Sequence, residues 1–279
     1  MSRKAIWSVV SLASVASLAG CPGPGGGSRQ PPAQLPSAEQ VVAQLTKLRA
    51  ERASFTAESV MDYWVGDNRV KGTVLVMGTS QRQVRFNALS PQGGGVLVDM
   101  ACNGTDFAYV DFQHNCQLTG PCTRQSIASL LRVELEPEDF EALAVGVAPV
   151  DPQATGTVTW DASKGLEVVK LTSPAGTQTI AIDASGGRTD VVSSELVGPD
   201  GKVVWSVQNS DFQTVKDAKG GEHRLPGKTR FKSPQQKADL LVEWKERTLN
   251  VTIDPAKFTV AVPPALARCG GAPATSPAP

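Results

Sequence analysis

The cysteines are the first candidates for chemistry in this sequence. The sequence contains five, and Cys102, Cys116, Cys122 and Cys269 form an even set that predicts two disulfides in an exported chain. Of the three possible pairings, we favour Cys102 with Cys116 and Cys122 with Cys269. The alternative is a metal site made of Cys102, His114, Cys116 and Cys122. These residues lack the closely spaced pairs of structural zinc sites, so we expect no metal.

Catalytic motifs are not found in the sequence. It has no Gly-x-Ser-x-Gly elbow, no His-Glu-x-x-His and no nucleophile with a base nearby. Its two histidines, His114 and His223, both lie beside predicted turns. The acidic run from Glu134 to Glu141 is explained as the first turn and solvated face of a helix, where negative charge suits the helix dipole. We therefore expect a protein that is not an enzyme.

The fifth cysteine, Cys21, stands at the end of an export signal. Arg3 and Lys4 precede an apolar run from residue 5 to residue 19, and small residues come before the cysteine. This run is too short to span a bilayer, which takes about 20 apolar residues. The stretch Leu18-Ala19-Gly20-Cys21 resembles the lipobox of bacterial lipoproteins, which implies that Cys21 is acylated and becomes the anchored amino terminus. The alternative is a soluble exported protein whose cysteine is incidental.

Composition divides the chain into four parts. Residues 1–20 are the predicted lipoprotein signal peptide, and residues 21–36 are the acylated cysteine and a Gly- and Pro-rich tether. Residues 37–269 form the predicted folded domain, and residues 270–279 form a disordered tail. Basic and acidic residues are balanced at 27 each, without a basic cluster, so nucleic acid is not an expected partner.

Periodicity predicts the elements that position these residues. Ser37 and Gln40 have the form of a capping box at the start of an amphipathic helix. From Phe55 onward apolar residues alternate with a period of two, and turns such as Asn103-Gly104 separate short strands. Two helices interrupt this pattern between residues 123 and 147, and strands resume near residue 158. The absence of a βαβ rhythm predicts one long, curved antiparallel sheet with an N-terminal helix and a mid-chain helical pair.

Aromatic and helical residues are candidates to line the concave side of such a sheet. Four tryptophans fall on four different predicted strands, and the alternative for each is an ordinary core position whose indole N–H finds a partner. The candidate cavity and lid residues are Trp64, Trp160, Trp205, Trp244, Ile127, Leu130, Leu131, Phe140 and Leu143.

Several segments together resemble a known family. Residues 84–96 contain Arg-Phe-x-x-Leu-Ser-Pro and a Gly-rich loop, and residues 127–131 and 140–146 supply a Leu-Leu pair and Phe-x-x-Leu-x-x-Gly. With the ending at residues 249–258, these segments resemble the LolA/LolB group of lipoprotein carriers over most of residues 38–262. The resemblance implies an α+β, mainly β fold: an incomplete, half-open antiparallel barrel of about 11 strands, closed by a helical lid over a cavity for acyl chains.

The resemblance also assigns roles to single residues. Arg85 matches a basic strand position that holds the lid or a lipid head group, and its alternative is a solvated strand residue. Pro91, Gln92 and Gly93 match a membrane-facing loop, in which the receptor member of the family carries an exposed leucine. Because Gln92 stands at that position, the resemblance implies lipid binding more directly than membrane insertion.

We therefore expect a lipoprotein that is anchored to the outer membrane, faces the periplasm and binds acyl chains in a hydrophobic half-barrel. The ligand would be an acyl chain or lipid. The partners would be the outer-membrane bilayer, a periplasmic lipoprotein carrier and a lipoprotein cargo. Pro22 follows Cys21 in place of the aspartate that retains lipoproteins at the inner membrane. The alternative is a structural or adaptor envelope lipoprotein of the same fold, with a filled cavity and no transport activity.

Overall fold

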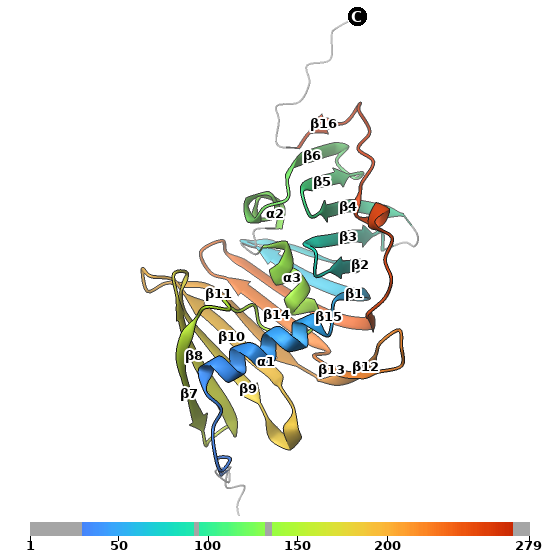
Figure 1. Cartoon of the computed structure of the whole chain (residues 1–279). Coiled ribbons are helices and arrows are strands. Elements are labelled where there is room, and N and C mark those ends of the chain that lie inside the picture. Colours follow the sequence, from blue (N-terminus) through green and yellow to red (C-terminus); the bar gives the residue numbers. More distant parts are fainter. Residues whose placement is uncertain (1–29, 92–94, 132–135, 270–279) are drawn as a thin grey trace, which may run out of the picture.

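The computed structural model describes residues 30–91, 95–131 and 136–269 (Figure 1). The predicted signal peptide, Cys21 and the tail at 270–279 lie outside the described residues. The domain boundaries and the acylation therefore stay predictions.

Most of the described residues belong to one large sheet. Its fourteen strands in this part of the chain follow the order β16-β6-β5-β4-β3-β2-β1-β15-β14-β11-β10-β9-β8-β7, and the sheet is not closed. The strands are β1 (Ser54–Val65), β2 (Asn68–Thr79), β3 (Gln83–Leu89), β4 (Val96–Asn103), β5 (Asp106–Asp111), β6 (Cys116–Pro121), β7 (Thr155–Asp161), β8 (Leu166–Ser173), β9 (Gly176–Asp183), β10 (Asp190–Val197), β11 (Val203–Ser210), β14 (Lys228–Ser233), β15 (Ala238–Leu249) and β16 (Ala267–Arg268). A separate two-stranded ribbon consists of β12 (Gln213–Lys216) and β13 (Glu222–Leu225).

The predicted fold class is confirmed by this sheet. Neighbouring strands are antiparallel, apart from β16, which pairs with β6 in parallel. The described sheet has more strands than the about 11 that the resemblance implies, and one of them is the short edge strand β16, which the chain adds after β15. Strand β1 joins the two wings, since it pairs with β2 on one side and with β15 on the other.

The N-terminal helix α1 (Ala38–Ala50) begins at the predicted capping box. Ser37 Oγ accepts a hydrogen bond from the Gln40 backbone N–H, and the Gln40 side chain accepts one from the Ser37 N–H. Both bonds satisfy amide donors that the first turn of a helix leaves unpaired. The apolar face of α1 then packs Val41 and Leu45 onto the wing that contains β7 and β8.

Two short helices, α2 (Arg124–Leu131) and α3 (Pro137–Ala144), connect β6 to β7 as the predicted mid-chain insertion. Pro137 occupies the first turn of α3, where a missing N–H costs nothing. In Figure 1, α1 crosses in front of one wing and α3 lies in front of the centre of the sheet. Within the described ranges, none of the helices has the length and apolar character that a bilayer crossing requires. The short 3-10 turns are η1 (Ser185–Gly187) and η2 (Pro255–Phe258).

Candidate functional site

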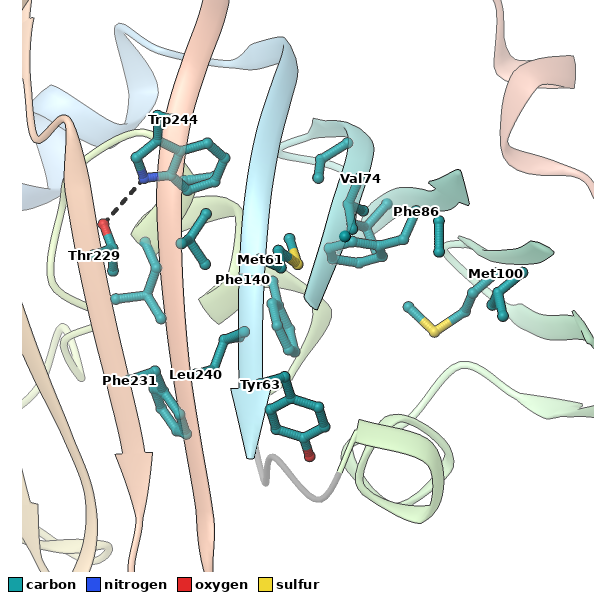
Figure 2. A pocket seen from close by; sticks show the side chains of 18 of the residues that line it. Met61, Tyr63, Val74, Phe86, Met100, Phe140, Thr229, Phe231, Leu240 and Trp244 are labelled. Carbon is teal, nitrogen blue, oxygen red and sulfur yellow. Dashed lines mark hydrogen bonds between the residues drawn. The ribbon is translucent and has the colours of Figure 1, made fainter. Parts of the chain in front are cut away.

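A cavity of about 200 Å³ lies between the sheet and α3 (Figure 2). Successive side chains of a strand point to opposite faces, so every second residue of the central strands reaches the face that α3 covers. The wall residues include Met61 and Tyr63 on β1, Val70, Val74 and Val76 on β2, Val84, Phe86 and Ala88 on β3, Val98 and Met100 on β4, Thr229 and Phe231 on β14, and Leu240, Val242 and Trp244 on β15. Phe140, Leu143 and Ala144 of α3 close the cavity from the other side.

The lining is almost entirely apolar. Among the described residues that line it, none is Asp, Glu, Lys, Arg or His. The indole N–H of Trp244 donates to Thr229 Oγ1 at 3.1 Å, which Figure 2 shows as a dashed line. The Tyr109 hydroxyl donates to Asp111 at 3.1 Å, and burial together with that carboxylate raises the pKa of Tyr109. These polar groups are thus engaged by the protein, and the cavity offers a ligand hydrocarbon and aromatic surface.

The size of the cavity fits a slender apolar ligand. Its volume exceeds the ~150 Å³ of an engineered apolar cavity that binds benzene, and it is below the ~300 Å³ at which pockets for drug-sized molecules begin. Phe140 of α3 meets Phe86 of β3 edge to face, with ring centroids 5.7 Å apart. Removal of α3 would therefore expose aromatic surface on both the lid and the wall.

One end of the cavity reaches the surface at Val70. This residue lines the cavity and is nevertheless 67% exposed. Val96, at the start of β4, is exposed as well and pairs with Leu89 at the end of β3. Pro91, in the predicted membrane-facing loop between these strands, is exposed. Gln92 and Gly93 lie outside the described residues, so the role of this loop stays a prediction.

Buried arginines hold the carboxyl end of α3. Arg52 Nη1 donates to the carbonyl of Val145 at 2.7 Å, and Arg247 Nη1 donates to that of Ala144 at 3.0 Å. Arg247 Nη2 also donates to the carbonyl of Pro226. Positive charge suits this end of a helix, where the carbonyls lack partners. Burial, followed by the charge of the nearby Arg52, lowers the pKa of Arg247 to about 9.

A third arginine joins α3 to α1. Arg49 Nε donates to Glu141 Oε2 at 2.9 Å, and Arg49 Nη2 donates to the backbone carbonyl of Glu138 at 2.8 Å. The Glu141 side chain is only 1% exposed. Burial raises the pKa of Glu141 to about 7, although Arg49 acts in the opposite direction. The sequence analysis missed these arginines, because each acts on a helix about a hundred residues away and carries no local signal.

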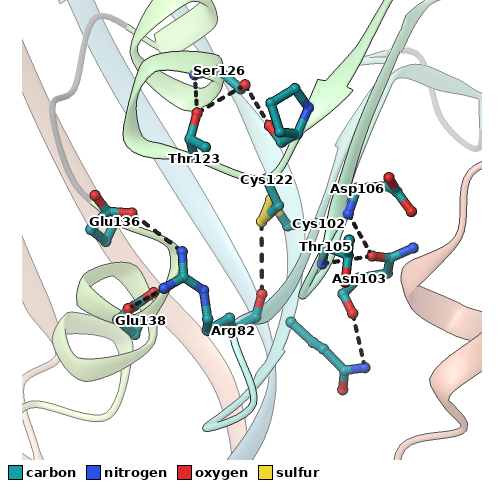
Figure 3. The surroundings of a disulfide bond; sticks show 12 residues. Arg82, Cys102, Asn103, Thr105, Asp106, Cys122, Thr123, Ser126, Glu136 and Glu138 are labelled. Carbon is teal, nitrogen blue, oxygen red and sulfur yellow. Dashed lines mark hydrogen bonds and ion pairs between the residues drawn. A yellow bond between two sulfur atoms is a disulfide. The ribbon is translucent and has the colours of Figure 1, made fainter.

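Two disulfides link segments of the wing that contains β4, β5 and β6, and Figure 3 shows the surroundings of the one between Cys102 and Cys122. They join Cys102 to Cys122 and Cys116 to Cys269, so the pairing that the sequence favoured is wrong. Cys102 and Cys116 pair with opposite ends of β5, at Phe107 and Asp111, which puts them roughly 13 Å apart along the strand. A disulfide needs Cα atoms within about 7 Å. Because these cysteines are oxidised, the alternative metal site is also wrong.

The disulfide between Cys102 and Cys122 also fixes where α2 begins. Cys122 lies two residues before α2, and Thr123 Oγ1, between them, accepts a hydrogen bond from the Ser126 N–H in the first turn. Figure 3 shows Arg82 nearby, where it binds Glu138 at 2.9 Å and Glu136 at 3.5 Å. The amino-terminal end of α3 is therefore tied to the turn between β2 and β3.

The structure brings only some of the predicted cavity residues together. Trp244, Phe140 and Leu143 line the cavity. Trp205 is buried beside it in a cluster with Leu143 and Phe231. Three of the predicted residues, on α3 and β15, thus lie in the cavity lining, while the other predicted residues that the structure describes have other positions.

Those positions follow from strand phase and element order. Trp64 follows Tyr63 and so points to the opposite face, where the Arg69 guanidinium lies 4.9 Å from its ring. Trp160 belongs to β7 at the far edge of the sheet. Ile127 is buried in a separate cluster around Cys102 and Cys122. The side chains of Leu130 and Leu131 lie outside the described residues.

Arg85 does not hold the lid in the described structure. It lies between Val84 and Phe86 on β3, so its side chain points to the face of the sheet away from α3. There it makes a two-pronged ion pair with Asp99, at 2.9 and 2.6 Å, and donates to the carbonyl of Lys257 at 2.7 Å. Arg85 thus ties the C-terminal segment to the outer face, and the expected lid contact is wrong.

Comparison with known proteins supports the fold. No family model matches this sequence, and no curated protein matches it at the sequence level. Solved structures are similar to it: a DUF1329 family protein from Desulfovibrio piger has a TM-score of 0.54 at 12% identity, over 80% of this chain and 95% of that one. A LolA superfamily protein from Nitrosomonas europaea has a TM-score of 0.53 at 11% identity, over 81% and 99%. A domain described as an outer membrane lipoprotein-sorting protein, from Vibrio parahaemolyticus, has a TM-score of 0.53 at 9% identity, over 79% and 97%.

Proposed function

We propose that this protein is an outer-membrane lipoprotein that faces the periplasm and holds an acyl chain in the cavity under α3. The observation that carries the proposal is a cavity without charged lining residues, which a short helix covers and which opens at Val70. Its role would be the receipt or transfer of lipids or lipoproteins. Two proteins of similar fold are described as a LolA superfamily protein and as a lipoprotein-sorting domain, which is in line with this role.

The chemistry of the cavity explains why an acyl chain is the proposed ligand. Transfer of a methylene group from water to an apolar site is favourable by about 0.8 kcal/mol, and it needs no polar partner. A charged or strongly polar ligand would lose its hydration here and gain no hydrogen bond in return. Catalysis is not proposed, because the described lining holds no Asp, Glu, Lys, Arg, His, Ser or Cys, and the hydroxyl groups of Thr229 and Tyr109 are engaged by Trp244 and Asp111.

The predicted acyl anchor and the cavity mouth support a location at a membrane of the cell envelope. Acylation of Cys21 would hold the chain on a membrane, and two disulfides are typical of an oxidising envelope compartment. Val70, which lines the cavity, and Val96, at the start of β4, are exposed and suited to meet a lipid surface or the acyl chains of a delivered lipoprotein. A periplasmic carrier as the donor and a lipoprotein as the cargo belong to the same proposal.

The competing hypothesis is a structural or adaptor lipoprotein of the same fold. It requires a cavity plugged by the protein's own side chains. Trp205 and Phe231 do fill one side, with ring centroids 6.5 Å apart. The remaining space of about 200 Å³ argues for a bound ligand.

The test measures co-purified lipid and the binding of a fluorophore that competes with it. Full-length protein with Cys21→Ser, which carries no covalent acyl chains, is purified from a membrane-containing host and extracted for mass spectrometry. We expect co-purified lipid and saturable binding of N-phenyl-1-naphthylamine, an uncharged apolar fluorophore that lipid displaces. Ala88→Phe, which fills the cavity, should abolish both. Leu75→Phe, on the opposite face of β2, is the matched control and should change neither. Absence of lipid and of fluorophore binding in the parent protein would refute the proposal.

A further inference from the structure

The contact between α1 and α3 is unusual for a helix interface, because a buried carboxyl group forms it. Glu141 faces away from the cavity, while its helix neighbours Phe140, Leu143 and Ala144 line the cavity. Any movement that breaks the contact of Glu141 with α1 therefore moves the cover of the cavity. This contact is therefore a candidate for the regulation of the proposed lipid site.

Only half of the Glu141 carboxyl group is bound. Oε2 accepts from Arg49 Nε, whereas Oε1 is buried and has no hydrogen-bond partner among the described residues. A buried carboxylate is favourable only when its oxygens are paired and hydrogen-bonded. A protonated carboxyl loses much less on burial, and it still accepts the Arg49 hydrogen bond through one oxygen. The geometry thus favours the protonated form as long as α3 covers the cavity.

The other charges around Glu141 do not replace the missing partner. On its own helix, Glu138 repels the ionised form of Glu141, and Asp139 is itself buried enough for its pKa to be raised. Arg82, from the turn between β2 and β3, is engaged by Glu136 and Glu138.

The cations at the other end of α3 are also engaged. Arg52, which follows α1, and Arg247 of β15 donate to the carbonyls of Val145 and Ala144. Arg49 is therefore the cation that contacts the Glu141 carboxyl group in the described structure, and it meets one oxygen of the two.

We infer that Glu141 and Arg49 form a proton-controlled latch, which keeps α3 over the cavity when Glu141 is protonated and favours opening when Glu141 is ionised. When α3 lifts, Glu141 reaches water and ionises as an ordinary glutamate does. This inference rests on the proposed function, because it concerns the release of the apolar ligand from the same cavity.

The direction of the pH effect follows from the two states. Burial raises the pKa of Glu141 from its ordinary 4.5 to about 7 in the closed state. A group whose pKa is higher in the closed state stabilises that state fully below the open-state value, and this stabilisation is lost as the pH rises through the closed-state value. Between pH 5.5 and pH 8 the open form should gain about tenfold or more, since each unit of pKa difference is worth a factor of ten.

Two measurements on the full-length Cys21→Ser protein test the latch. The first is the rate at which N-phenyl-1-naphthylamine, uncharged over this range, leaves the cavity at pH 5.5 and at pH 8. The second is the rate of hydrogen exchange of the α3 amides without ligand. It is expressed as the ratio of the rate in the parent protein to the rate in the Glu141→Gln variant at each pH, so that the chemical exchange rate cancels.

We expect ligand release from the parent protein, and the ratio of α3 exchange in the parent to that in Glu141→Gln, to be about tenfold higher at pH 8 than at pH 5.5. Glu141→Gln keeps the shape and the Arg49 contact without titrating, so its ligand release should stay slow at both pH values. Glu58→Gln, at an exposed glutamate on β1, is the matched control and should respond to pH as the parent does.

The outcomes separate the latch from the proposed function. An exchange ratio that does not change with pH, or a Glu141→Gln variant whose ligand release keeps the pH effect, would overturn the latch even if lipid binds. A protein that binds no apolar ligand at any pH would refute the proposed function, while the exchange measurement would still decide whether α3 is controlled by Glu141.

Discussion

The two helical covers of the sheet are held down by different forces. Under α1, Leu45, Leu171 and Ile180 are completely buried against one another, and the contact is aliphatic. Under α3, apolar side chains surround a cavity, and the helix is held at its ends and on its outer side by Arg49, Arg52 and Arg247.

One sheet can thus carry both a fixed cover and a lid. Lifting α1 would expose a packed apolar core, and water offers nothing in exchange. Lifting α3 would expose the aromatic contact of Phe140 with Phe86, but it would also expose arginines, carbonyls and carboxylates that water can hydrogen-bond, so that the net cost of each lost polar contact is small. We therefore interpret α1 and the strands beneath it (the α1 half) as a rigid scaffold. We interpret α3, the strands around the cavity and the wing with the disulfides (the α3 half) as the part that binds the ligand.

We expect the greatest loss of unfolding free energy from a substitution in the packed core under α1. Leu45→Ala removes a fully buried side chain from tight packing, and it should cost about 3 kcal/mol of unfolding free energy, through lost burial and the cavity that remains. Leu240→Ala removes the same atoms beside an existing cavity and should cost less than half as much. Urea denaturation at neutral pH measures both. Equal losses would mean that the two halves are packed alike.

The second prediction concerns the disulfides, which occur in the α3 half. Cys102 and Cys122 enclose a loop of 20 residues, so replacing both by alanine should cost about 3 kcal/mol. Hydrogen exchange should become faster in β4, β5 and α2 and stay unchanged in α1. The double replacement of Cys116 and Cys269 is the control for loss of a disulfide as such. It frees the C-terminal segment on the outer face and should leave ligand binding intact. If α1 loosened as well, the two halves would not be independent.

A third prediction uses one substitution at two places. Ala154 lies in the packed core of the α1 half, and Ala88 lines the cavity. Ala154→Phe should cost about 1–3 kcal/mol, because a packed core cannot take the ring without strain. Ala88→Phe should change stability by less than about 1 kcal/mol, since the ring enters empty space, and it should reduce ligand affinity at least tenfold. Thermal unfolding and fluorophore titration measure the two effects. A comparable loss of stability in both variants would argue against a cavity able to accept a ligand.

Local patterns were sufficient to predict the scaffold and part of the site. The capping box at Ser37 fixed the start of α1, and the period of two on β1 and β2 identified the strands that form the wall. Alternation also places Trp64 on the other face of the sheet, because Met61 and Tyr63 point to one side of β1 and Trp64 directly follows Tyr63. The prediction of Trp64 as a cavity residue did not take this into account. Phe140 and Leu143 were identified because helical spacing puts them on one side of α3.

The remaining features depend on contacts between distant segments. Arg52 and Arg247 act on α3 from 93 and 103 residues away, and a lone arginine in a sequence does not reveal whether it will be buried. The disulfide pairing depends on the parallel contact of β16 with β6, which brings Cys269 to Cys116. The role predicted for Arg85 was wrong because it came from a family resemblance. Its position between Val84 and Phe86 instead predicts that its side chain points to the outer face of the sheet.

The smallest predicted effect distinguishes the two halves by their response to acid. Asp217, in the turn of the ribbon beside the end of α1, pairs with His223 at 3.0 Å and accepts N–H bonds from Gly221 and Lys219 at 2.8 Å each. Asn250 donates to Asp217 and to the carbonyl of Glu51, which follows α1. His223 first, and then these amides, hold the pKa of Asp217 far below its ordinary value of 3.8.

A carboxylate with a depressed pKa stabilises the fold above its ordinary pKa, and this contribution is lost as the pH falls below that value. The α1 half should therefore weaken only below about pH 4, whereas α3 should respond near neutral pH through Glu141. Asp217→Asn should lower stability slightly at pH 6 and make the further loss between pH 4 and pH 2.5 shallower, as measured by urea denaturation at each pH. Asp151→Asn, at a loop carboxylate, is the control and should keep the slope of the parent. An unchanged slope in Asp217→Asn would mean that the acid sensitivity of the scaffold arises from other carboxylates, and that the end of α1 is held by packing alone.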